Sequence, residues 1–164
     1  LVKAFARAID GLPADAARLT IVGDGDEMGA IAGIVRRSGL IGQVHLAGRQ
    51  PREVIRDLLH RSDVFVLASR LEAFGIAALE ARAAGLPVVT MAQSGARDFL
   101  TAGEDALLAS DDRELADYLR RIILDVGLRH RLSEAASRPL PGVDWTAVAP
   151  LYEAEYRSAI KDAG

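Results

Sequence analysis

The chain has 164 residues, and half of them are hydrophobic, which is enough to bury a core and argues against disorder. A formal net charge of −3 and an aromatic content of 5% argue against the basic, base-stacking surface of a nucleic-acid-binding domain. There is no cysteine, so disulfides and thiolate metal sites are excluded and a reducing cytoplasm is compatible.

The chain carries no signal peptide and no membrane-spanning run. It starts without Met, inside a segment that is predicted to be helical. We therefore expect residues 1–164 to form a single domain that is a fragment of a longer polypeptide.

Hydrophobic patterning predicts strands that alternate with helices along the chain. The strands are predicted at residues 19–22, 44–47, 64–68, 86–89 and 106–109. The helices are predicted at residues 1–9, 27–37, 51–61, 76–84, 96–100, 111–126, 128–137 and 145–160. This alternation is typical of an α/β fold with a Rossmann-like, doubly wound parallel sheet and helices on both faces.

The chain is organised around residues 63–89, which read as strand, loop, helix and strand. Gly75 lies where the helix begins, and the first helical N–H groups and the helix dipole favour an anion there. Glu72 lies in the loop, and Glu80 lies inside a helix whose other residues are apolar except for Arg82. A phosphate flanked by two carboxylates that can hold hydroxyl groups describes a sugar nucleotide. The alternative is that both glutamates are solvated.

The loops that follow the first four strands fall at residues 23–25, 48–50, 69–74 and 92–95. In an open parallel sheet these loops gather at the carboxyl edge, where ligands bind. This convergence favours the ligand-binding interpretation of the two glutamates, although it is an inference from the fold alone.

A second glycine motif resembles the fingerprint of a dinucleotide-binding site and offers an alternative place for a phosphate. Residues 23–29 read Gly-x-Gly-x-x-x-Gly after a strand, and Arg49 would then meet a ribose phosphate. Asp24 and Asp26 put negative charge where a pyrophosphate would lie, which argues against a dinucleotide site. The three histidines have no metal-ligand spacing, so we predict no metal site.

Several motifs match one family together. They are Val-Gly-Asp-Gly at 22–25, Val-His-Leu-Ala-Gly at 44–48, Asp-Val-Phe-Val-Leu-Ala-Ser at 63–69, Glu-Ala-Phe-Gly at 72–75, the second Glu at 80, and Ala-Gly-Leu-Pro-Val-Val at 84–89. With these motifs, nearly the whole chain resembles the carboxyl-terminal half of a retaining, GT-B-fold glycosyltransferase of family four, also called group one. Ala68, Ala73 and Arg82 depart from the usual Pro, Gly and Met of that pattern.

The resemblance implies the donor-binding half of a hexosyl-type transferase for carbohydrate biosynthesis, with a nucleoside-diphosphate sugar as donor and no cofactor or metal. Glu72 would be the catalytic carboxylate beside the transferred sugar. The implied donor-binding residues are Glu80, Phe74, Gly75, Ile76, Gly23, Gly48 and Arg49. Glu80 would hold the ribose, the Phe74–Ile76 backbone would meet the diphosphate, and Gly48 and Arg49 would approach the base.

The same resemblance implies that an amino-terminal acceptor domain, a first strand and the phosphate-binding Arg and Lys lie upstream of Leu1. The isolated chain would then be inactive. The full-length enzyme is expected in the cytoplasm, with peripheral membrane association left open, and with no membrane segment or nucleic-acid partner of its own. Two alternatives stay open: a sugar-nucleotide epimerase-like domain and a non-catalytic nucleotide-binding module.

Overall fold

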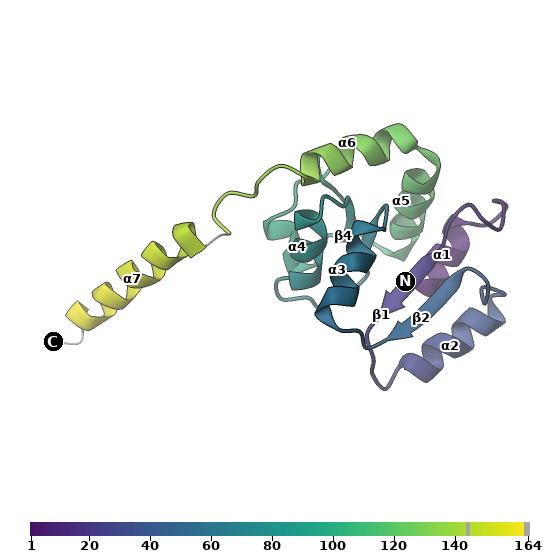
Figure 1. The fold of residues 1–164 in the computed structure, drawn as a ribbon, viewed down its shortest axis with the longest axis horizontal. Coiled ribbons are helices and arrows are strands. Elements are labelled where there is room, and N and C mark those ends of the chain that lie inside the picture. The colour runs from purple at the N-terminus through teal and green to yellow at the C-terminus, as the bar shows by residue number, and fades with distance from the viewer. Residues whose placement is uncertain (144, 163–164) are drawn as a thin grey trace.

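The computed structural model describes residues 1–143 and 145–162, in which helices alternate with short parallel strands (Figure 1). The elements are α1 (Val2–Ala8), β1 (Leu19–Val22), α2 (Met28–Arg37), β2 (Val44–Gly48), α3 (Arg52–His60), β3 (Phe65–Leu67), α4 (Ile76–Ala83), β4 (Val88–Met91), the 3-10 helix η1 (Gly95–Asp98), β5 (Ala106–Ala109), α5 (Asp112–Leu124), α6 (Val126–Ala136) and α7 (Trp145–Asp162). The predicted α/β class with parallel strands and flanking helices is confirmed.

The strands of the described residues form two hydrogen-bonded sheets. β1 pairs with β2, while β4 lies between β3 and β5, and every pairing is parallel. The sequence predicts one continuous sheet, but β1 and β3 do not pair with each other. They are separated by a cavity of about 790 Å³ that both strands line, so no ladder can form across it.

β4 is the centre of the larger sheet, and its alternate side chains enter two different cores. Val89 and Met91 pack among buried residues of α1, α5 and α6. Val88 packs on the opposite face with Ala78 of α4 and with Ala96 of η1. Helices therefore cover both faces of this sheet, as the alternation of elements predicts.

The smaller sheet has a core of its own on one face. Phe5 of α1 and Ile9, which follows that helix, pack with Val35 of α2 and Val44 of β2. The opposite face is less well covered, because Val22 of β1 is 38% exposed. The β1–β2 sheet is thus packed on its α1–α2 side only.

A glycine turn ends α4 at its carboxyl terminus. The N–H of Gly85 donates to the carbonyl of Arg82, and the N–H of Leu86 donates to the carbonyl of Ala81, which together form a Schellman motif. Leu86 is therefore part of the turn, and β4 begins at Val88 instead of at the predicted residue 86. At the start of α5, the Asp111 carboxylate accepts from the backbone N–H groups of Arg113 and Glu114 and caps the helix.

The closing helix α7 stands apart from the other elements in Figure 1 and exposes several large apolar side chains, including Trp145 at 78%. In the part of the chain that the structure describes, no helix is long and apolar enough to cross a membrane.

One buried ion pair joins α4 to the turn before β5. The Arg82 guanidinium donates to Asp105 over 2.8 Å, with side-chain exposures of only 8% and 6%. Arg82 also donates to the carbonyl of Arg138, and the second carboxylate oxygen of Asp105 accepts from the N–H of Thr101. Of the two charged residues on α4, Arg82 thus has a structural partner, whereas Glu80 is exposed.

We expect Asp105→Ala to lower the free energy of unfolding by about 3–5 kcal/mol, because it leaves the Arg82 charge buried without its partner. Urea unfolding of the folded chain measures this change. The matched control is Asp112→Ala, which breaks the Arg70–Asp112 pair, whose side chains are 60% and 71% exposed. That change is expected to cost less than about 1 kcal/mol. Equal costs for the two variants would contradict the role given to the buried pair.

Candidate nucleotide-sugar site

The amino-terminal end of α4 presents free backbone donors. Gly75 precedes the helix with φ 88° and ψ 51°, a left-handed conformation that favours glycine. The first helical bonds run from Ala78 and Leu79 to the carbonyl of Gly75. Among the described residues, no acceptor is bonded to the N–H of Ile76 or of Ala77. Two N–H groups and the positive end of the helix dipole therefore face outward together.

Glu72 lies at the same helix end. Its Oε1 accepts a hydrogen bond of 3.1 Å from the N–H of Gly75, and its side chain is half-buried. This contact holds the carboxylate in front of the helix, where the dipole also stabilises negative charge. The second oxygen, Oε2, remains able to accept a hydrogen bond from a hydroxyl group.

The Glu72 loop is held in place by the loop after β4. The N–H of Gly95 donates to the carbonyl of Glu72 over 2.8 Å. The two backbones approach so closely that a Cβ on Gly95 would overlap the carbonyl of Ala73. The ring of Phe74 contacts that of Phe99, with centroids 5.2 Å apart and ring planes tilted by 46°, and Phe74 remains 43% exposed.

A surface ion pair ties the start of the same loop to α5. Arg70 donates to Asp112 over 3.0 Å. The hydrogen bond and charge of Arg70 lower the pKa of the Asp112 carboxyl group below its ordinary value. Arg70 is thus engaged with a carboxylate, which lowers its availability to neutralise a bound phosphate.

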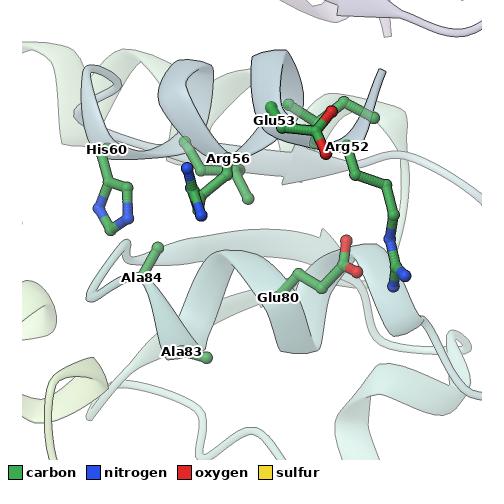
Figure 2. Close-up of a pocket in the computed structure, with 9 residues that line it drawn as sticks. Arg52, Glu53, Arg56, His60, Glu80, Ala83 and Ala84 are labelled. Carbon is green, nitrogen blue, oxygen red and sulfur yellow. The ribbon is translucent and has the colours of Figure 1, made fainter. Parts of the chain in front are cut away.

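Glu80 lines a cleft of about 500 Å³ between α3 and α4. Figure 2 shows its carboxylate at one end of the cleft beside the guanidinium of Arg52, which extends from the start of α3. Glu80 also lines the larger cavity between the two sheets, together with Ala77. It is therefore open to a ligand, unlike the buried Arg82.

Two further residues line this cleft without a role predicted from the sequence. Arg56 and His60 lie along α3 on the side that faces Glu80 (Figure 2). The signal was present, because Arg52, Arg56 and His60 are four residues apart and such residues share one helix face. The cleft is therefore lined by basic side chains along α3 together with the carboxylates of Glu53 and Glu80.

The glycine loops of the smaller sheet meet each other. The N–H of Gly23 donates to the carbonyl of Gly48 over 2.8 Å, which joins the loop after β1 to the loop after β2. Arg49 is exposed next to this bond and lines neither cavity. Val22 at the end of β1 and Ser69 after β3 line the same large cavity. The loops after β1 and β2 are thus joined on the smaller sheet, and the loops after β3 and β4 are joined on the larger sheet. The cavity lies between these two pairs.

Among the described residues, no group of three or more His, Asp or Glu side chains is placed to hold a metal ion. The arrangement offers instead two N–H groups for an anion and two carboxylates for hydroxyl groups. Its acids cannot neutralise a diphosphate, so that charge must be met by backbone donors and by cations.

Comparison with known proteins agrees with this chemistry. The model of the family described as glycosyl transferases group 1 matches residues 1–138. The chain is 32% identical to the D-inositol 3-phosphate glycosyltransferase of Kribbella flavida over 97% of its own length. It spans only 40% of that relative.

Two solved structures resemble the fold. The pneumococcal O-GlcNAc transferase GtfA, in complex with UDP and GlcNAc, superposes with a TM-score of 0.79 at 18% identity, over 97% of this chain and 32% of that one. Anabaena HepE in complex with UDP-glucose superposes with a TM-score of 0.70 at 22% identity, over 82% of this chain and 38% of that one. At these identities the likeness concerns the fold.

We expect Gly95→Ala to destabilise the chain by about 1–3 kcal/mol, because the added methyl group must push the Glu72 loop away from the loop after β4. Urea unfolding measures the cost, and amide exchange at Gly75 reports the displacement. Gly42→Ala is the matched control, since a Cβ there meets nothing within 4 Å. If Gly95→Ala unfolds like the control, the close approach does not hold the loop.

Proposed function

The chain belongs to the glycosyl transferases group 1 family, and on this premise we propose that it is the donor-binding half of a retaining glycosyltransferase. The donor is a nucleoside-diphosphate sugar, and a hexosyl group is transferred to an acceptor held by an amino-terminal domain. The observation that carries the proposal is the α4 terminus, where two unpartnered N–H groups lie beside the Glu72 carboxylate.

The diphosphate is assigned to the N–H groups of Ile76 and Ala77. When the bond between the anomeric carbon and the diphosphate oxygen breaks, negative charge grows on the leaving diphosphate. Preorganised N–H donors and a helix dipole stabilise such charge more in the transition state than in the bound donor. The remaining positive charge is assigned to Arg and Lys side chains upstream of Leu1.

Glu72 is assigned to the transferred sugar. Its Oε1 is engaged by Gly75, which orients the carboxylate, and Oε2 is available to a sugar hydroxyl group. The helix terminus that would hold the diphosphate adjoins this carboxylate, so the sugar attached to that diphosphate would lie within reach of it.

Glu80 is assigned to the ribose, one turn further along α4. Its exposed carboxylate is open to the cleft that Arg52 also lines, and two ribose hydroxyl groups can donate to one carboxylate. The base is assigned to the side of Gly23, Gly48 and Arg49, across the cavity from α4. UDP is the nucleotide to test first, because the HepE and GtfA structures contain it.

We expect Glu80→Gln to weaken UDP binding by about 1.5–3 kcal/mol, or roughly 10- to 150-fold in Kd, because a charged hydrogen-bond acceptor is lost. Calorimetric titration measures the change. Glu53→Gln is the matched control, since Glu53 lines the same cleft and loses the same charge. An unchanged affinity for Glu80→Gln, or an equal loss in both variants, would remove the ribose role.

In the full-length enzyme, we expect Glu72→Gln to lower kcat and kcat/KM together while UDP affinity stays within about threefold of the wild type. Both constants fall because the substitution removes an interaction that is made mainly in the transition state. Glutamine keeps an oxygen that can accept from Gly75, so the loop retains its anchor. Wild-type turnover would remove Glu72 from the mechanism, and an equal loss of UDP affinity would make it a nucleotide-binding or structural residue.

The 164-residue chain alone is expected to bind UDP weakly and to transfer no sugar from UDP-glucose, because acceptor-site and phosphate-binding groups lie elsewhere in the proposal. A radiolabelled transfer assay with the purified chain tests this. Sustained transfer would contradict the assignment of those groups upstream.

A further inference from the structure

Arg52 is the first residue of α3, and in the part of the chain that the structure describes its guanidinium has no hydrogen-bond or ion-pair partner. The positive end of a helix dipole disfavours a cation in the first turn, so this position does not stabilise α3. Glu53, the next residue, is the one whose charge suits that turn. A role for the Arg52 charge is therefore to be sought across the cleft between α3 and α4.

The group that Arg52 meets across this cleft is the Glu80 carboxylate (Figure 2). Among the described residues the two side chains form no ion pair with each other, and the Glu80 carboxylate accepts no hydrogen bond. A guanidinium offers only donors, whereas an ionised carboxylate offers only acceptors. This end of the cleft therefore presents a donor and an acceptor that both remain available to a ligand.

A hydroxyl group is the ligand group that matches both side chains. It donates its hydrogen to one partner and accepts from another through its oxygen lone pairs. A phosphate at this position would be repelled by Glu80, and an ammonium group would be repelled by Arg52. An uncharged group that donates to Glu80 and accepts from Arg52 avoids both repulsions.

The Arg52 charge has a second consequence when a diphosphate lies at the start of α4. Glu80 follows Ile76 by four residues, a separation of about 6 Å along the helix axis. Two negative groups at such a distance repel each other, and a cation close to one of them offsets that repulsion. Arg52 therefore allows an acid on α4 to lie near the diphosphate position.

We propose that Arg52 is a specificity-determining residue for the donor, because its guanidinium donates to the oxygen of the ribose hydroxyl group whose hydrogen Glu80 accepts. This role rests on the proposed function, in which Glu80 holds the ribose. It adds that the cleft selects ribonucleotides over deoxyribonucleotides, since a ligand without that hydroxyl group leaves both side chains unpaired. Arg56 is one turn further along α3 and further from the Glu80 carboxylate, so it does not share the role (Figure 2).

The test compares UDP with 2′-deoxy-UDP and 3′-deoxy-UDP on the 164-residue chain, with Kd values taken from amide NMR titrations. We expect at least one deoxynucleotide to bind the wild-type chain about tenfold more weakly than UDP, or weaker still. Arg52→Gln is expected to reduce this ratio about threefold or more, because the substitution removes a charged donor that only UDP uses. Arg56→Gln is the matched control, since it removes the same charge from the same cleft, and it is expected to keep the wild-type ratio.

The ratio compares two ligands on one protein, so a loss of stability that affects both ligands equally does not change it. Equal affinity of the wild-type chain for all three nucleotides would overturn the role of Arg52, as would an equal fall of the ratio in Arg52→Gln and Arg56→Gln. If Glu80→Gln weakens UDP binding while Arg52→Gln keeps the wild-type ratio, only the assignment of Arg52 fails. If UDP does not bind, or if Glu80→Gln leaves its Kd unchanged, the proposed ribose position fails and the role of Arg52 fails with it.

Discussion

The hydrogen bond between the Glu72 carboxylate and the N–H of Gly75 is the interaction on which the candidate site depends. It places an acid in front of a helix end whose next two N–H groups are unpartnered. The bond requires the loop to remain where it is, and Gly95 secures this by donating to the Glu72 carbonyl across a contact that admits no side chain. Gly95 thus holds the loop in place, and Gly75, through its left-handed conformation, leads that loop into α4.

The division of the strands into two sheets determines how the rest of the site is distributed. The carboxylates and the helix terminus belong to the larger sheet, whereas Gly23, Gly48 and Arg49 belong to the smaller one. The cavity between the sheets is common to both, since Val22 and Glu80 each line it. The relative placement of the residues proposed to hold the sugar and those proposed to hold the base therefore depends on how the two sheets are arranged.

The sequence was sufficient for local structure, because Gly85 and Asp111 act through their own backbone geometry or through neighbours a few residues away. It also identified Glu72 and Glu80 as unusual, since both interrupt an apolar segment. It did not reveal that Arg82 pairs with Asp105, because that contact joins residues far apart along the chain. The break between β1 and β3 was missed for the same reason: strand patterning specifies which segments are strands, whereas pairing depends on which neighbour is present. The basic face of α3 could have been recognised from its four-residue spacing.

Binding of a sugar nucleotide's diphosphate at the amino-terminal end of α4 can be observed residue by residue by amide NMR of the isotopically labelled chain. On titration with UDP, we expect saturable shifts of the Ile76 and Ala77 amide resonances, which uridine at the same concentration does not produce. Saturable shifts elsewhere in the domain, with the Ile76 and Ala77 resonances unmoved, would contradict it.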